Sequence, residues 1–156
     1  MSYRVSGLPL EPFAPLFAMN DTELLAQGAR RQIADEKPGF PCRVTLADAE
    51  PGEALILLNY QHHAAPSSPY RAAGPVFVRE SARQSSELTG TVPPYLATRL
   101  LSLRAYDAEG LMVDADVVEG RDLEPMIARM FANDSVDYLH AHFARRGCYA
   151  CRIDRA

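Results

Sequence analysis

The sequence predicts an α+β protein with a largely antiparallel sheet of about six short strands and two main helices. Three observations support this class: short β-rich segments joined by turn residues, two stretches with helical spacing or capping, and no apolar run long enough to cross a membrane. A length of 156 residues fits one compact domain, so we expect a single domain over residues 1–156.

The N-terminal half is predicted to hold the first helix and two strands. Asn20 and Glu23 have the spacing of a capping box, which predicts a helix over residues 20–34. The apolar run ALILLNYQH predicts a central strand over residues 54–62, and PVFVRE predicts another. The proline- and serine-rich segments on either side of PVFVRE are predicted to be long loops, which are either variable surface or functional lids.

The C-terminal half is predicted to hold two hairpins with a helix between them. The segment RLLSLRAYDAEGLMVDADVVEG is typical of two strands joined by a turn at Asp107–Gly110. Apolar residues recur at helical spacing through RDLEPMIARMFA, which predicts an amphipathic helix. The segments VDYLHAHFA and CYACRIDR, joined by an Arg-Arg-Gly turn, predict the final hairpin.

Composition argues against several classes of partner. The formal net charge of -4 lacks the basic surface of a general nucleic-acid-binding protein, so we expect no nucleic-acid partner. No membrane partner is expected, and the N-terminal residues MSYRVSGLPLEPF lack the apolar region of a secretory signal. The 3 cysteines, an odd number, fit a reducing compartment, so we expect a cytoplasmic location.

Cys148 and Cys151 have the spacing of a redox dithiol. Such motifs gain their reactivity at the N-terminus of a helix, whereas both cysteines lie in a predicted strand. Positions three apart in a strand point to opposite faces. The pattern therefore argues against a redox dithiol and against a zinc knuckle.

His140 and His142 are two residues apart, so both imidazoles are predicted to lie on one face of the strand. The register of the hairpin decides which residues join them. In one register His142 faces Tyr149, and in the other, slipped by one residue, His140 faces Arg152. A different cysteine joins the histidine face in each case, and the sequence leaves both registers open.

Two kinds of chemistry stay open for these residues. Cys42, His62, His140 and His142 would supply zinc or iron ligands if their strands converge, but nothing local specifies this, so no metal is favoured. His140, His142 and Cys148 are candidates for a catalytic thiol and imidazole. The sequence contains no phosphate-binding glycine loop and no motif of the common hydrolase or dinucleotide-binding classes. The reaction and any cofactor therefore stay unassigned.

Arginine is far more frequent than lysine in this sequence. Arg79, Arg104 and Arg152 each lie in a predicted strand, and they are candidates for an anion pocket because guanidinium groups bind carboxylate and phosphate through paired hydrogen bonds. Tyr70 and Arg71, in the loop before PVFVRE, are predicted to frame this pocket. The alternative is a solvated sheet face on which these arginines pair with acidic residues.

Four blocks in order resemble a bacterial family of unknown function, DUF1203. They are PGFPCRVTLADAEPGEALILLNYQHH, SPYRAAGPVFVRE, RLLSLRAYDAEGLMVDADVVEG and YLHAHFARRGCYACRIDRA, and they cover nearly the whole chain. Cys151 departs from the family pattern, which has a small residue there, and this further weakens the dithiol hypothesis. The resemblance implies a stand-alone, single-domain bacterial protein and no particular activity.

The sequence thus leaves two classes of function open. The favoured one is a domain that binds a small anionic ligand, or an enzyme of unrecognised type, with a pocket lined by arginine, histidine and cysteine. The alternative is an interaction module without catalytic activity. In that case the Arg-rich strands and an exposed hairpin edge would bind another protein or a second copy of the chain as a homo-oligomer.

Overall fold

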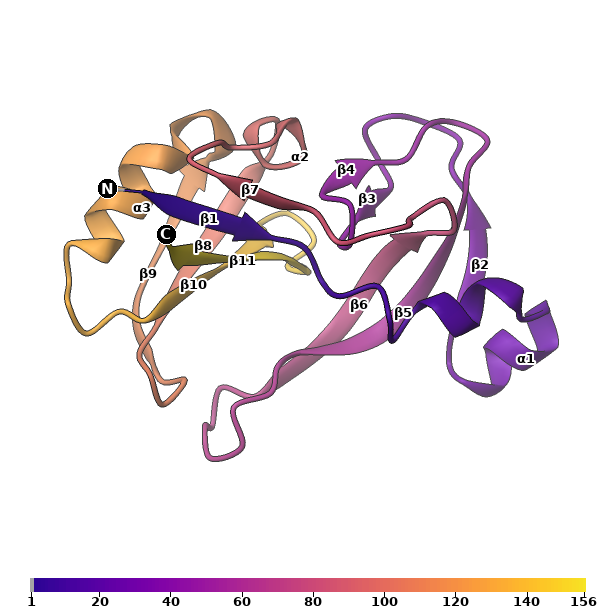
Figure 1. The fold of residues 1–156 in the computed structure, drawn as a ribbon, viewed down its shortest axis with the longest axis horizontal. Coiled ribbons are helices and arrows are strands. Elements are labelled where there is room, and N and C mark those ends of the chain that lie inside the picture. The colour runs from indigo at the N-terminus through magenta and orange to yellow at the C-terminus, as the bar shows by residue number, and fades with distance from the viewer. Residues whose placement is uncertain (1) are drawn as a thin grey trace.

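The computed structural model describes residues 2–156 and confirms the α+β class. Within this range, eleven strands form two sheets, and three short α-helices and two 3-10 helices connect them. Figure 1 shows the six-stranded sheet in the left half of the molecule and the five-stranded sheet in the right half. The strands are more numerous than predicted because short strands also form inside segments that the sequence predicts to be loops.

The six-stranded sheet contains β1 (Tyr3–Ser6), β7 (Glu87–Thr89), β8 (Leu100–Tyr106), β9 (Met112–Glu119), β10 (Tyr138–Phe143) and β11 (Tyr149–Arg155). Its order is β7-β1-β11-β10-β8-β9, and all neighbours are antiparallel. The two predicted C-terminal hairpins, β8–β9 and β10–β11, are both confirmed. β1 and β11, from opposite ends of the chain, pair in the middle of the sheet.

The five-stranded sheet contains β2 (Arg30–Ile33), β3 (Pro41–Cys42), β4 (Ala47–Asp48), β5 (Ala54–His63) and β6 (Ala72–Arg79). Its order is β2-β5-β6-β3-β4. β5 is the interior strand predicted at residues 54–62, and it forms a long hairpin with β6. The pairs are antiparallel except β3–β6, where Cys42 and Phe77 are partners in parallel strands.

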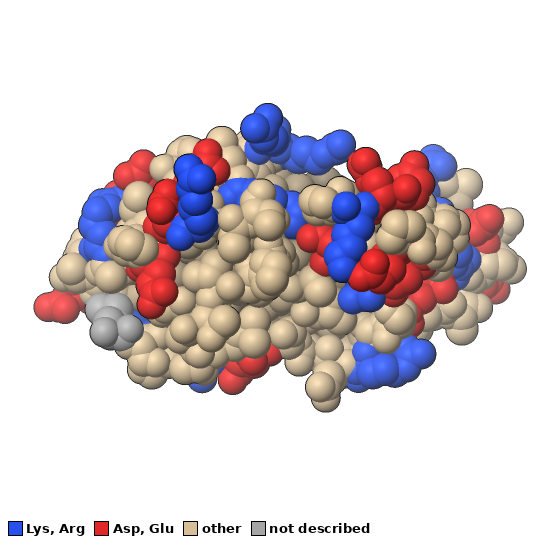
Figure 2. All heavy atoms as spheres, turned by 90° about the horizontal axis from the view of Figure 1, so that it is seen from above, with Lys and Arg blue, Asp and Glu red and all other residues tan. Residues whose placement is uncertain are grey.

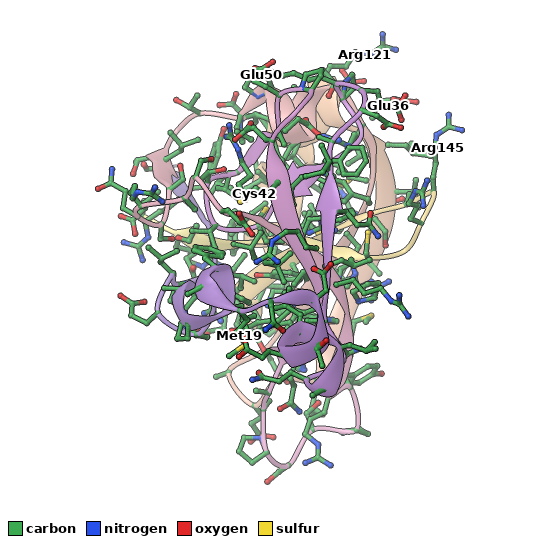
Figure 3. The ribbon with its side chains drawn as sticks, turned by 90° about the vertical axis from the view of Figure 1, so that its right-hand side faces the viewer. Met19, Glu36, Cys42, Glu50, Arg121 and Arg145 are labelled. Atoms are coloured by element: carbon green, nitrogen blue, oxygen red, sulfur yellow. The ribbon has the colours of Figure 1, made fainter. Side chains whose placement is uncertain are left out.

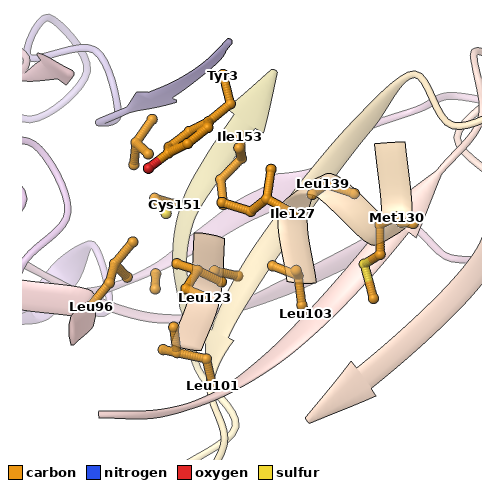
Figure 4. Close-up of a cluster of buried hydrophobic side chains, with 14 of the residues drawn as sticks. Tyr3, Leu96, Leu101, Leu103, Leu123, Ile127, Met130, Leu139, Cys151 and Ile153 are labelled. Carbon is orange, nitrogen blue, oxygen red and sulfur yellow. The ribbon is translucent and has the colours of Figure 1, made fainter. Parts of the chain in front are cut away.

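The helices are α1 (Asp21–Ala26), α2 (Pro94–Ala97), α3 (Leu123–Phe131), η1 (Ala14–Ala18) and η2 (Gly120–Asp122). α3 is the predicted amphipathic helix, and its apolar stripe packs on one face of the six-stranded sheet (Figure 4). Leu123 and Ile127 of α3 and Leu103 and Leu139 of the sheet belong to one buried cluster. Each such side chain stabilises the fold by about 1.5–3 kcal/mol, so this layer is the main core. None of the described helices has the length and apolar character needed to cross a bilayer.

The helix predicted over residues 20–34 is correct at its start and wrong in its second half. The capping box is present, because Asn20 and Glu23 exchange two hydrogen bonds of 2.9 Å between side chain and backbone. The helix ends at Ala26, and Gly28 adopts a φ of 70°, which glycine tolerates best. Residues 30–33 then pair with β5, and the backbone hydrogen bonds of this pairing outweigh the helix preference of their arginine and glutamine side chains.

The final hairpin combines the two registers that the sequence leaves open. Next to the turn His142 faces Tyr149, and further along the strand His140 faces Arg152. A β-bulge joins the two registers, because β11 has one extra residue, Ala150, between these pairs. The bulge also changes the alternation of side chains. Cys151 belongs to the main core cluster, whereas Cys148, which precedes β11, is half-buried and packs against this cluster from its edge.

All six residues of β10 are buried, because both faces of this strand are covered. Its apolar side chains belong to the core under α3, whereas its tyrosine and histidines pack against residues from the end of β5. The β5–β6 loop is attached to the β8–β9 turn, where Ser68 Oγ donates a 2.7 Å hydrogen bond to the carbonyl oxygen of Gly110. The two sheets thus meet along β10, and this junction positions the candidate site.

Candidate functional site

The 4 histidines of the chain gather at the junction between the two sheets. His62 and His63 end strand β5, and His140 and His142 alternate along β10. The ring centroids of His62 and His142 are 5.1 Å apart, and those of His63 and His140 are 5.4 Å apart. The β5–β6 hairpin, which packs against β10, therefore brings together strand ends whose convergence the sequence left open.

Tyrosine rings hold two of these imidazoles in position. His62 stacks on Tyr149, with ring centroids 5.0 Å apart and an angle of 15° between the rings. His63 stacks on Tyr106 at 4.3 Å, and its Nε2 lies 2.8 Å from the hydroxyl oxygen of Tyr138. Aromatic pairs of this kind have defined geometries, so the orientations of the rings are set by the fold rather than by a ligand.

Burial keeps these histidines neutral at pH 7. Desolvation lowers the pKa of His140 to about 2, and the positive charges of neighbouring side chains add to this effect. Desolvation also lowers the pKa of His62 and of His142 to about 4. The charge of Arg104 lowers both values further, while the hydrogen bond from His142 to the Gly147 carbonyl acts in the opposite direction.

Each of the four imidazoles has a buried ring nitrogen without a hydrogen-bond partner among residues 2–156. For His142 the free atom is Nε2, because Nδ1 lies 3.0 Å from the carbonyl oxygen of Gly147. A carbonyl oxygen only accepts, so Nδ1 carries the proton and Nε2 of the neutral ring carries a lone pair. His142 is 1% exposed, and this unpaired nitrogen is therefore well shielded from water.

A cavity of about 260 Å³ opens beside His62 and His142, and we call it the histidine–arginine cavity. Its walls are formed by His62, Ala72, Ala73, Gly74, Pro75, Arg104, His142, Arg146, Gly147, Cys148 and Tyr149. No aspartate or glutamate lines it, and no carboxylate among residues 2–156 lies within 4.0 Å of the guanidinium of Arg104 or Arg146. The charged groups on its walls are thus all positive.

A second cavity, of about 490 Å³, shares Arg146 and Cys148 with the first, so the two are neighbours. Figure 2 shows basic side chains around the hollow between the two halves of the molecule. Glu36 and Arg145 also line the second cavity and project from the same side of the fold (Figure 3). Phenylalanines, prolines, further arginines and a second carboxylate, Glu119, also line it, which gives it a mixed apolar and charged character.

Two of the arginines predicted for an anion pocket lie at the histidine cluster. Arg104 lines the histidine–arginine cavity and is the β8 neighbour of His140. Arg152 is the β11 neighbour of the same histidine. Its guanidinium forms an ion pair with Asp154 and lies 4.0 Å from the centre of the Tyr138 ring. Arg152 is thus engaged by a carboxylate, whereas Arg104 has no ion-pair partner among residues 2–156.

The other residues predicted for the ligand pocket lie outside the cavity walls. Arg79 forms an ion pair with Glu53 through hydrogen bonds of 3.0 and 2.5 Å on the five-stranded sheet. Tyr70 is 42% exposed and meets the ring of Tyr106 edge-on at 6.4 Å. Arg71 is exposed in the β5–β6 loop. The structure therefore brings together the histidines, Arg104 and Cys148, but not the whole predicted set.

Of the four residues considered as metal ligands, Cys42 lies apart from the three histidines. Its buried Sγ accepts backbone N–H groups from Thr45 at 3.5 Å and from Arg79 at 3.3 Å. Within residues 2–156, no group of three or more histidine, cysteine, aspartate or glutamate side chains has an arrangement that could hold a metal ion.

Three residues of the site were not among the predicted ones: Arg43, Arg146 and Tyr149. Arg146 and Tyr149 belong to the hairpin that the sequence singled out, and the register with Tyr149 opposite His142 was one of the two considered. Arg43 is only 2% exposed. Nothing in the sequence predicts this, because arginine is almost never fully buried.

Comparison with known proteins identifies the family. The model of DUF1203, a family described as proteins of unknown function, matches residues 39–155, a range that contains every residue of the histidine–arginine cavity. A search of curated proteins found no match, and neither did a search of solved structures. The resemblance noted in the sequence is thus confirmed, and the chain belongs to the DUF1203 family.

Proposed function

We propose that the protein binds a small anionic molecule in the histidine–arginine cavity. The observation that carries the proposal is a wall with two arginines, two histidines and no carboxylate. An anion in such a place accepts charge-assisted hydrogen bonds from guanidinium groups, which are about twice as strong as neutral ones. The volume of about 260 Å³ suits a phosphate or a small carboxylate rather than a large organic ligand.

The unpaired imidazole nitrogens support the same proposal. A buried polar atom without a partner costs about 1–3 kcal/mol, and a ligand that forms a hydrogen bond with it recovers part of this cost. His142 Nε2 is such an atom, and it belongs to a residue that lines the cavity. A bound anion also favours the protonated imidazole, so we expect His62 and His142 to take up protons when the ligand binds.

The proposal includes a cellular setting. The 3 cysteines are free thiols, and one of them, Cys148, lines the cavity. A site with an accessible thiol is maintained in a reducing compartment. We therefore place this single-domain protein in the bacterial cytoplasm, as its composition and family resemblance predicted.

Titration calorimetry with phosphate, sulfate, oxalate and succinate tests this function. The titrations use a cationic buffer at pH 6.5 and constant ionic strength, because an anionic buffer would compete for the cavity. We expect at least one anion to bind, and Arg104→Gln to weaken its binding by about tenfold or more. Arg121→Gln is the matched control, since Arg121 is an exposed arginine far from the cavity walls. Absence of binding, or equal weakening by both variants, would overturn the proposal.

A further inference from the structure

The guanidinium of Arg43 is a buried positive charge without a carboxylate partner. Its Nε donates a 2.8 Å hydrogen bond to the carbonyl oxygen of Tyr149, and its Nη1 donates a 2.7 Å bond to that of Pro41. Its Nη2 lies 3.1 Å from the Sγ of Cys148. No carboxylate among residues 2–156 comes within 4.0 Å of it. Burying a charge without an opposite charge is costly, so negative charge beside this guanidinium is stabilised.

Cys148 is the thiol that contacts this guanidinium and is in position to meet a ligand. It is half-buried, and it lines both cavities. Cys42 and Cys151, in contrast, are 0% and 1% exposed. Burial also raises the pKa of the Cys151 thiol, which keeps this residue unreactive.

A second, independent feature of the same wall points to a ligand beside Cys148. His142 Nε2 is unpaired, almost fully buried, and belongs to a residue that lines the histidine–arginine cavity. Arg104 lies on the same wall without an ion-pair partner. An anion that these two residues hold is therefore in the same cavity as the sulfur of Cys148.

We propose that Cys148 is a nucleophilic cysteine whose sulfur, which accepts a hydrogen bond from the guanidinium of Arg43, attacks an electrophilic carbon of small anions held in the histidine–arginine cavity. The preference for anions rests on the function proposed above, whereas the reactivity of the thiol rests on Arg43 alone. The ligand class is thus a small carboxylate or phosphate ester that carries a good leaving group or an activated carbon near its charge.

The reaction is a substitution at carbon. The S–H proton passes to solvent, and a sulfur electron pair forms the new S–C bond. The leaving group departs with the electron pair of the bond that breaks, so no electrons are gained or lost overall. Iodoacetate, a small anion of the proposed class, gives an S-carboxymethyl thioether and iodide.

Alkylation of the native protein at pH 7 tests the inference, with the modified cysteine identified by mass spectrometry. Neutral iodoacetamide measures the reactivity of the thiol alone. We expect it to modify Cys148 about tenfold faster than N-acetylcysteine, and to leave Cys42 and Cys151 unmodified. Iodoacetate measures the preference for anions. We expect the ratio of the iodoacetate rate to the iodoacetamide rate to be several times higher at Cys148 than for N-acetylcysteine.

Two variants separate the contributions. Arg43→Gln is expected to slow both reagents about equally, and labelling of Cys42 and Cys151 reports whether this variant has unfolded. Arg104→Gln is expected to abolish the preference for iodoacetate and leave the iodoacetamide rate unchanged. An iodoacetamide rate at Cys148 no higher than that of N-acetylcysteine would refute the proposal that Cys148 is a reactive nucleophile. It would not affect the proposal that the cavity binds anions. A fast iodoacetamide reaction without a preference for iodoacetate would instead refute the proposal that Cys148 reacts with anions held in the cavity.

Discussion

Acidification from pH 7 to pH 5 is expected to destabilise the fold through its buried histidines. In the folded protein the pKa is about 2 for His140 and about 4 for His62 and His142, because burial disfavours the charged ring. The ordinary value in the unfolded chain is 6.5. Below pH 6.5 the unfolded chain therefore binds protons that the folded chain does not, and the free energy of unfolding falls with pH.

The size of this effect follows from the pKa values. At pH 5 each of the three histidines lowers the free energy of unfolding by about 2 kcal/mol, because each loses about 1.4 kcal/mol per pH unit between pH 6.5 and pH 5. The sum of about 6 kcal/mol is comparable to the whole stability of many domains, about 5–15 kcal/mol. The facing groups Arg104 and Arg152 keep their charge throughout. Burial alone would raise the pKa of Glu53, but hydrogen bonds from Arg79 and its neighbours lower it to about 2, so the stability that this carboxylate contributes is fully present above pH 4.5 and is lost only below it.

Urea unfolding at pH 7, 6 and 5 measures this effect. Tyrosine fluorescence or circular dichroism follows the transition, and cationic buffers keep the cavity free of anions. His62→Gln removes one titrating ring, so it is expected to reduce the loss between pH 7 and pH 5 by about 2 kcal/mol, whatever its effect at pH 7. A free energy of unfolding that changes by less than about 1 kcal/mol over this range would show that the histidines are hydrated, and would refute the reasoning.

Three further outcomes are expected. Arg79→Ala, which breaks the partly buried ion pair with Glu53, should lower the free energy of unfolding by about 1–2 kcal/mol in urea and leave anion affinity unchanged. Gly110→Ala should destabilise by about 1–3 kcal/mol, because φ is 78° and a new Cβ would lie 2.6 Å from that of Ala65; an unchanged melting temperature would contradict this. Anion binding at pH 7 should take up protons, which calorimetry in two buffers of different ionisation enthalpy detects; no uptake would exclude a role for the cavity histidines.

Elements with locally encoded stability were predictable from the sequence. The capping box at Asn20, the apolar stripe of α3 and the β8–β9 turn at Gly110 each depend on residues within a few positions of one another. Strand β2 was not predictable, because residues 30–33 tolerate a helix as well as a strand, and only pairing with β5 decides between them. The bulge at Ala150 likewise depends on how β11 fits between β10 and β1.

The residue types of the candidate site were predictable, but their partners were not. The sequence places His140 and His142 on one face, and the structure confirms this because the bulge lies in the neighbouring strand. That His62 meets His142 depends on the packing of one sheet against the other, for which no local pattern exists. The partner of Arg79 was unpredictable for the same reason, because Glu53 lies 26 residues away in the sequence. Its ion pair with Arg79 keeps this arginine out of the anion pocket.

The pairing of β1 with β11 has a consequence for the synthesis of the chain. Tyr3 pairs with Arg155, and β7 joins the sheet only through β1. During translation, half of the six-stranded sheet therefore cannot form until β11 has left the ribosome. Contacts so distant in sequence form slowly, and the apolar surface of β8 and β10 is exposed to other molecules in the meantime. We expect newly made chains to depend on chaperones during this interval, and C-terminal truncations that remove β11 to aggregate rather than fold.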